Sequence, residues 1–280
     1  MSFRRLPEGL GLGLLGAVIL FWTLAPLYNM MVMSITPVNA IFAGKLWPDN
    51  PTLGNYATVF RQDNHYLKFF WLQLANSVFI AGASMIIVLT VATLASFAVG
   101  RLRLRFGPFV NNLALTTYLI PAAFLAIPFY QVMGAYNLLD TRWGLVFAVV
   151  AFTTPYAIWV LRNYADSVPF ELDEAAMVDG ASRWQIFCLV YLPLIRPAMI
   201  AIGTFALLHA WNEYLYAFLI LSHETRVTLT VTLGLFRSDD SAPWPLLMAV
   251  GILYSIPPTV LYFSVRKYMV TGLTSGGVKD

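Results

Sequence analysis

The side chains that most often carry catalysis or bind metal are few in this sequence and lie far apart. The three histidines, His65, His209 and His223, show none of the short spacings of metal ligands. The single cysteine, Cys188, excludes a disulfide within the chain, and we expect it to be a small apolar side chain. The sequence therefore predicts no metal site, no cofactor on this chain and no enzyme active site.

Glycine patterns that bind nucleotides in other proteins are absent or misplaced. The phosphate loop G-x-x-x-x-G-K-[ST] is missing, because the Gly44-Lys45 pair lacks the upstream glycine. The stretch from Gly11 to Gly16 reads G-x-G-x-x-G but lies inside an apolar helix, so we interpret it as close helix packing. Energy from ATP must therefore come from another chain, or the protein uses none.

The most informative polar stretch is residues 174–193, EAAMVDGASRWQIFCLVYLP, which lies between two strongly apolar segments. Ser167 is the expected N-cap of a helix that should end at Gly180 in the left-handed conformation. Ser182 and Gln185 have the spacing of a capping box, which starts a second helix. The sequence predicts two short helices hinged at Gly180. This arrangement suits contact with a soluble partner, and an ordinary helical hairpin is the alternative.

A second polar cluster, His209-Ala210-Trp211-Asn212-Glu213-Tyr214, lies in an apolar segment. An acidic group at mid-membrane costs roughly 2.5–3.5 kcal/mol, so Glu213 should face a cavity or a partner. Stacking faces and hydrogen-bonding tips together suit a sugar. The alternative is that Glu213 reaches water near the outer interface, where Trp211 and Tyr214 form an aromatic belt.

Both polar segments belong to a chain that is 59% hydrophobic and 11% charged, whereas soluble domains carry about 25% charged residues. A helix needs about 20 apolar residues to cross a bilayer. Six windows are long enough, at about residues 9–33, 72–100, 108–133, 143–161, 197–221 and 245–265. The sequence predicts an all-α membrane protein with six transmembrane helices, in which residues 1–280 form a single transmembrane domain.

The basic residues are divided unevenly between the two sides of the membrane. Of the 17 Lys and Arg residues, eleven lie on one side and six on the other. Because cytoplasmic loops carry the excess of basic residues, both termini, the 162–196 loop and the 266–280 tail should face the cytoplasm. Arg101, Arg103 and Arg105 are expected to anchor this topology rather than to recognise a particular lipid.

The polar stretch and several other segments resemble one known family. Glu174-Ala175-Ala176, then Gly180, then Leu192-Pro193 resembles the cytoplasmic EAA loop of the permease subunits of bacterial ABC importers, with Val190 where that family usually has isoleucine. The segment Leu53 to Tyr56, the Trp211-Asn212-Glu213 cluster, residues 125–138 and the tail 272–279 are similar to maltose-permease-like carbohydrate importers. The resemblance covers nearly the whole chain and implies a type I importer permease of the smaller type.

The resemblance also implies partners and a place in the cell. Such a permease lies in the bacterial inner membrane as a multi-pass protein and pairs with a second permease subunit. Two ATPase subunits, which hold ATP and Mg²⁺, dock below, and a periplasmic substrate-binding protein delivers the solute from above. The residues expected to couple to the ATPase are Glu174, Ala175, Ala176, Asp179 and Gly180. Those expected to bring the tail to the ATPase are Gly272, Leu273, Thr274, Ser275, Gly276 and Gly277.

The solute is expected to be a neutral sugar or polyol, because the second to fourth apolar windows contain no Lys or Arg that would favour an anion. Glycerol phosphate or another small polar solute is an alternative, as is a channel or scaffold without ATP coupling. Sugars need flat aromatic faces and a few polar groups. The expected path is therefore lined by Tyr118, Tyr130, Gln131, Thr154, Tyr156, Trp211, Asn212 and Glu213.

Overall fold

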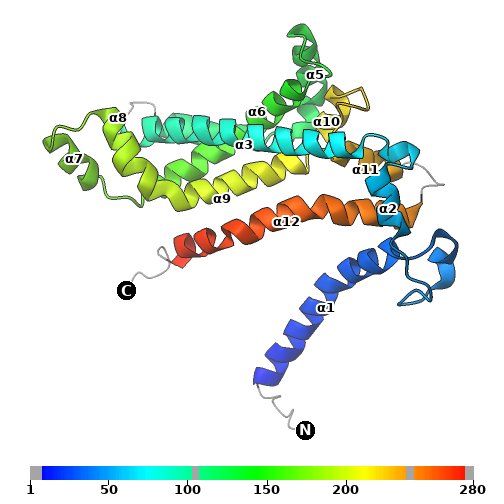
Figure 1. The fold of residues 1–280 in the computed structure, drawn as a ribbon. Coiled ribbons are helices and arrows are strands. Elements are labelled where there is room, and N and C mark those ends of the chain that lie inside the picture. The colour runs from blue at the N-terminus through cyan, green and yellow to red at the C-terminus, as the bar shows by residue number, and fades with distance from the viewer. Residues whose placement is uncertain (1–7, 103–106, 238–242, 275–280) are drawn as a thin grey trace. The chain divides into compact units, whose positions relative to one another are not determined.

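The computed structural model describes residues 8–102, 107–237 and 243–274, and the regular structure of these ranges is helical (Figure 1). Two compact units make up the chain and are described separately. Unit 1 is Met1–Phe70 with Leu233–Ile256, and unit 2 is Trp71–Thr232 with Pro257–Asp280. Helices α11 (Leu229–Arg237) and α12 (Trp244–Thr274) each contribute residues to both units.

Unit 1 contains the long helix α1 and the segment that follows it. This segment holds η1, α2 and η2, which are short because Pro37, Pro48 and Pro51 interrupt the chain. The Asn55 side-chain amide donates to the Ser34 carbonyl over 2.8 Å, and the hydroxyls of Ser34 and Tyr56 lie 2.8 Å apart. These bonds tie α2 to the end of α1. The bounds are α1 Glu8–Ser34, η1 Val38–Ala43, α2 Gly54–Arg61 and η2 His65–Leu67.

Unit 2 is built around α3, α6 and α9, whose facing sides pack small and branched apolar side chains. A buried cluster joins Val88 and Ala92 of α3 to Ala157 of α6 and Ala206 of α9. Alanine at these positions lets helix backbones approach closely in a membrane. The bounds are α3 Phe70–Arg101, α4 Gly107–Tyr118, η3 Ala122–Leu125, α5 Ala126–Ala135, α6 Arg142–Ala165, α7 Glu171–Val178, α8 Arg183–Gln185, η4 Ile186–Tyr191, α9 Leu192–Trp211 and α10 Leu215–Ile220.

Among the described residues, five helices are long and apolar enough to cross a membrane, or six if one bent pair counts as a single span. The bent pair corresponds to the window predicted at 108–133, and its two parts meet at 84°. Pro121 lies at the break with φ −59°. Proline lacks a backbone N–H and disfavours helical geometry in the preceding residue, so the chain turns there. The window predicted at 108–133 is therefore two helices joined by a sharp break at Pro121, which form one span only together.

The window predicted at 197–221 also differs from the helix observed. A continuous rod runs from Arg183 to Trp211, so the second short helix leads directly into the span through a π-helical turn, η4. The rod ends ten residues before the predicted end. Tyr216 donates its backbone N–H to the Glu213 carboxylate over 2.9 Å, which caps α10. Glu213 thus lies between two helices and not within one.

The predicted tail starts later than expected. Helix α12 continues to Thr274, so Gly272, Leu273 and Thr274 are helical rather than a loose segment. The remaining predicted tail contacts, Ser275, Gly276 and Gly277, lie outside the described residues, as do Arg103 and Arg105.

Candidate functional site

The two short helices α7 and α8 lie at one end of unit 2, opposite the end that carries α5 and α10 (Figure 1). Helix α7 ends in a Schellman motif: Ala181 N–H donates to Ala176 over 2.9 Å and Gly180 N–H to Met177 over 3.0 Å. Gly180 takes a φ of +84°, the left-handed conformation predicted from the sequence. The hinge at Gly180 is confirmed.

The start of α8 is also as predicted, because the capping box is complete. Gln185 N–H donates to the Ser182 hydroxyl, and Ser182 N–H donates to the Gln185 amide oxygen over 2.8 Å. The N-cap predicted for α7 is wrong. The Ser167 hydroxyl instead donates to the Tyr164 carbonyl over 2.7 Å, and α7 begins after Phe170 without a side-chain cap.

Helix α7 presents an exposed face with both charge and apolar side chains. Glu174, Ala175, Asp179 and Gly180 are exposed. Three apolar side chains lie beside them: Val178 is 87% exposed, Leu172 44% and Met177 40%. Ala176 instead packs inward against the cluster of Phe97, Ile186, Phe187, Tyr191 and Ile195. An eight-residue helix that leaves this much apolar surface uncovered is suited to docking against another protein.

The inner side of α7 is held by an ion pair that the sequence did not reveal. Asp173 is 2% exposed, and its carboxylate lies 3.5 Å from Nε of Arg101, the last residue of α3. Burial raises the pKa of Asp173 above its ordinary value, and the Arg101 charge opposes that rise. Arg101 is 7% exposed, so it is not a surface anchor as predicted.

A cavity of about 550 Å³ lies in unit 2 beside the break between α4 and α5. The Tyr118 and Tyr156 rings stack there with centroids 5.1 Å apart, and the Tyr216 hydroxyl donates to the Ala122 carbonyl over 2.7 Å. His209 of α9 also lines the cavity. The lining residues are Thr117, Tyr118, Ile120, Pro121, Ala122, Leu125, Ala151, Phe152, Pro155 and His209.

Of the predicted path residues, only Tyr118 lines this cavity in the described part of the chain; Tyr156 stacks on Tyr118, and the others lie elsewhere. Thr154 and Asn212 donate to carbonyls of their own helices, those of Val150 and Leu208. Trp211 is 3% exposed. Tyr130 and Gln131 are exposed on α5, and Glu213 caps α10. His209 also lines the cavity; it belongs to the polar cluster predicted to suit a sugar but was not among the expected path residues. Its ring stacks on that of Phe205, and this four-residue spacing on one helix face could have added it.

A polar clasp lies at the other end of unit 2 from α7. The Asp140 carboxylate accepts the backbone N–H groups of Ser222 and His223 over 2.9 and 3.1 Å and pairs with Arg226 at 2.8 Å. Burial alone would raise the pKa of Asp140, but the bonds from His223 and Ser222 outweigh burial and lower it. The clasp joins the α5–α6 connection to the segment after α10.

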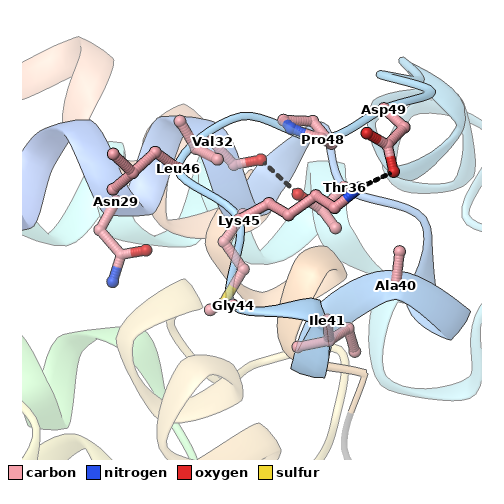
Figure 2. Close-up of a pocket in the computed structure, with 11 residues that line it drawn as sticks. Asn29, Val32, Thr36, Ala40, Ile41, Gly44, Lys45, Leu46, Pro48 and Asp49 are labelled. Atoms are coloured by element: carbon pink, nitrogen blue, oxygen red, sulfur yellow. Dashed lines mark hydrogen bonds and ion pairs between the residues drawn. The ribbon is translucent and has the colours of Figure 1, made fainter.

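Unit 1 holds a cavity of about 370 Å³ between the end of α1 and the loop after η1 (Figure 2). Several of its polar side chains already have partners. Lys45 pairs with Asp49, and the Thr36 hydroxyl donates to the backbone carbonyl of Val32 over 2.8 Å. No group of three or more metal-ligating side chains occurs anywhere in the described part of the chain.

Comparison with known proteins identifies the family. Residues 92–275, which include α6 to α10, match the family described as "Binding-protein-dependent transport system inner membrane component". That match spans more than half of the chain. The protein therefore belongs to this family, as a multi-pass inner-membrane permease subunit of a binding-protein-dependent ABC importer and not an enzyme. The resemblance noted in the EAA loop is confirmed.

Individual relatives match along almost the whole chain. The protein is 29% identical to the inner membrane ABC transporter permease protein YcjP of Escherichia coli, over 94% of both chains. It is 28% identical to the trehalose/maltose transport system permease protein MalG of Thermococcus litoralis, over 95% of both. A crystal structure of a bacterial ABC transporter that imports the acidic polysaccharide alginate matches with a TM-score of 0.79 and 25% identity, over 96% of this chain and 99% of that one.

Proposed function

We propose that this protein is one of two permease subunits of an ATP-driven sugar or polyol importer, and that α7 is its contact with an ATPase subunit. The observation that carries the coupling assignment is the exposed face of α7. Val178, Met177 and Leu172 leave apolar surface uncovered on a helix that the Schellman motif and the capping box hold in a fixed bend. Such a surface is stabilised only when a partner covers it.

The coupling residues have distinct roles on this surface. Glu174 makes a charge-assisted contact with the ATPase, and Ala175 allows its backbone to approach closely. Ala176, half-buried, fixes α7 to the Phe97–Tyr191 cluster. Asp179 and Gly180 set the angle between α7 and α8, because Gly180 takes a backbone conformation that other residues adopt with strain.

The cavity beside the α4–α5 break favours an uncharged solute. None of its lining residues is Lys, Arg, Asp or Glu, so an anion inside it would meet no compensating charge. Tyr118 and Phe152 offer flat faces that suit the C–H surfaces of a sugar, and His209 and Thr117 offer polar groups for its hydroxyls. This composition favours a neutral sugar or polyol over glycerol phosphate or an acidic saccharide such as alginate.

The distribution of basic residues and the place of α7 at one end of unit 2 support one orientation. The end of unit 2 that carries α7 and α8 faces the cytoplasm and the ATPase, together with both termini. The end that carries α5, α10 and the Asp140 clasp faces the periplasm, where the binding protein delivers the solute. A second permease completes the path, and the end of α12 approaches the ATPase pair.

The test is purification of the intact complex through an affinity tag on this chain, followed by reconstitution into liposomes. We expect a second permease and an ATPase subunit to co-purify. With the cognate binding protein present, ATP inside the liposomes should drive uptake of labelled maltose, trehalose or sorbitol but not of glycerol 3-phosphate or an alginate oligosaccharide. Purification without any ATPase subunit would contradict the coupling assignment, and selective uptake of the anions would contradict the solute class.

A further inference from the structure

Arg101, at the cytoplasmic end of α3, contacts three consecutive parts of the segment that carries α7. Its Nη2 donates to the Val168 carbonyl over 2.9 Å and to the Ala165 carbonyl over 3.3 Å. Its Nε lies 3.5 Å from the carboxylate of Asp173 on α7. One side chain therefore joins the end of α6, the connection and α7 to α3.

Aromatic rings complete the enclosure. The Arg101 guanidinium carbon lies 5.8 Å from the ring centroids of both Phe170 and Tyr191. Phe170 immediately precedes α7, and Tyr191 ends η4, where its hydroxyl bonds to Ser96 of α3 over 3.0 Å. The guanidinium thus lies between the residue that starts α7 and the turn that leads into α9.

The buried guanidinium strongly stabilises the arrangement of this segment, because its removal would leave the polar groups around it without partners. Carbonyls at the end of α6 carry the negative end of the helix dipole, and the planar guanidinium reaches two acceptors at once. Helix α7 has only eight residues, too few to persist without tertiary contacts. Its position relative to α3 is therefore set by Arg101 together with the contact of Ala176 with the Phe97 cluster.

The ion pair within this arrangement is incomplete. At 3.5 Å the contact between Arg101 and Asp173 is not a hydrogen bond, and Nε of Arg101 and Oδ1 of Asp173 have no hydrogen-bond partner among the described residues. Buried groups in this condition gain stability from any movement that brings them into bonding distance. Movement of α7 away from α3 would leave both buried charges without a partner, so the pair opposes that separation, while the two carbonyl bonds keep the segment attached.

We propose that Arg101 is a positioning residue that makes α3 follow α7, so that a movement imposed on α7 by the ATPase reaches a membrane-spanning helix. This inference rests on the proposed docking of the ATPase on α7. It predicts that α7 and α3 move together through the ATP cycle, and that they separate when the guanidinium is removed.

The experiment measures the distance between spin labels on α7 and α3 in the complete, reconstituted complex. Labels at Glu171→Cys, at the start of α7 and outside the proposed docking residues, and at Leu94→Cys, on a Cys188→Ser background, occupy exposed positions of unit 2. With Arg101 present, the distance distribution should be the same without nucleotide and with ATP and Mg²⁺. In Arg101→Gln, addition of ATP should shift or broaden it.

Two further variants and a control separate positioning from folding. Arg101→Lys keeps the charge but not the planar guanidinium, and Asp173→Asn removes only the carboxylate charge. Both should give smaller ATP-dependent shifts of the label distance than Arg101→Gln, and they replace it in the test if Arg101→Gln does not assemble. Arg196→Gln is the matched control, because Arg196 is exposed on α9, and it should behave as the unsubstituted protein.

The outcomes distinguish this inference from the proposed function. If an ATPase subunit co-purifies, the inference is overturned by an ATP-dependent label distance with Arg101 intact. It is equally overturned by unchanged distances in Arg101→Gln or, where that variant does not assemble, in both Arg101→Lys and Asp173→Asn. If no ATPase subunit co-purifies with the unsubstituted chain, the proposed function fails first.

Discussion

Replacement of Gly180 tests the hinge between α7 and α8 through backbone strain alone. Gly180 has a φ of +84°, and a Cβ built on it meets no atom within 4 Å. The Cβ of a leucine at this position would therefore meet no atom, yet the left-handed conformation costs an L-residue about 1–2 kcal/mol. An equilibrium shifted by that amount changes about 5- to 30-fold.

The strain acts on the two bonds of the Schellman motif, in which Gly180 and Ala181 donate to Met177 and Ala176. In Gly180→Leu the amide hydrogens of these two residues should exchange about 5- to 30-fold faster, because the bent arrangement is less populated by that factor. Gly180→Asn should have a smaller effect, since asparagine tolerates this conformation better. Gly82→Ala, at a helical glycine whose Cβ also meets nothing within 4 Å, is the control and should leave exchange unchanged.

Hydrogen exchange with mass spectrometry on the purified chain measures this directly, and ATP hydrolysis by the reconstituted complex measures its consequence. Gly180→Leu should lower the stimulation of ATP hydrolysis by the binding protein while the membrane part stays folded. Unchanged exchange at residues 180–181 in Gly180→Leu would refute the strain argument. Faster exchange with normal uptake and hydrolysis would refute the role of the hinge in coupling.

Three other perturbations give separate tests. Asp140→Asn should lower the melting temperature in detergent near neutral pH. Because the folded protein lowers the pKa of Asp140, the stability that this carboxylate contributes is present above the ordinary pKa of 3.8 and is lost as the pH falls below it. Equal melting temperatures of the two proteins at pH 7 would contradict the clasp. Tyr118→Ala and His209→Ala, which change residues lining the cavity, should reduce uptake several-fold more than Tyr130→Ala or Asn212→Ala, which do not. Stimulation of the ATPase by the binding protein should survive in all four variants. A larger loss of uptake in Tyr130→Ala and Asn212→Ala would move the path to α5 and the end of α9. Deletion of 274–280 should change ATPase stimulation without changing membrane insertion, and unchanged stimulation would leave the end of α12 without a role.

The sequence predicted elements that are set by local chemistry. Four of the six apolar windows coincide with helices α1, α3, α6 and α12, because a bilayer requires long apolar segments. Gly180, Ser182 and Gln185 shape only the few residues beside them. The break at Pro121 was not predictable in the same way. Prolines are tolerated in membrane helices and often only bend them, so Pro121 interrupts its helix while Pro155 lies inside α6.

Positions that depend on distant contacts could not be predicted. Arg101 belongs to a basic cluster that usually anchors topology, and only the packing of α6, α7 and η4 around it makes it buried. Glu213 was expected to face a path or water, but the break after Trp211 places its carboxylate at the start of α10. Of the predicted path, Tyr118 and Tyr156 meet because α4 lies against α6, which the spacing within either helix does not show.

The most direct test of the central claim is a cross-link from α7 to the ATPase in native membranes. The tagged chain carries Val178→Cys on the Cys188→Ser background, and Ser222→Cys, at the opposite end of unit 2, is the control. A short thiol-to-amine cross-linker should join Val178→Cys to a protein that mass spectrometry identifies as carrying a nucleotide-binding phosphate loop, and should not join Ser222→Cys to it. The absence of that adduct from Val178→Cys, at normal levels of the chain in the membrane, would contradict the claim that this permease is coupled to ATP through α7.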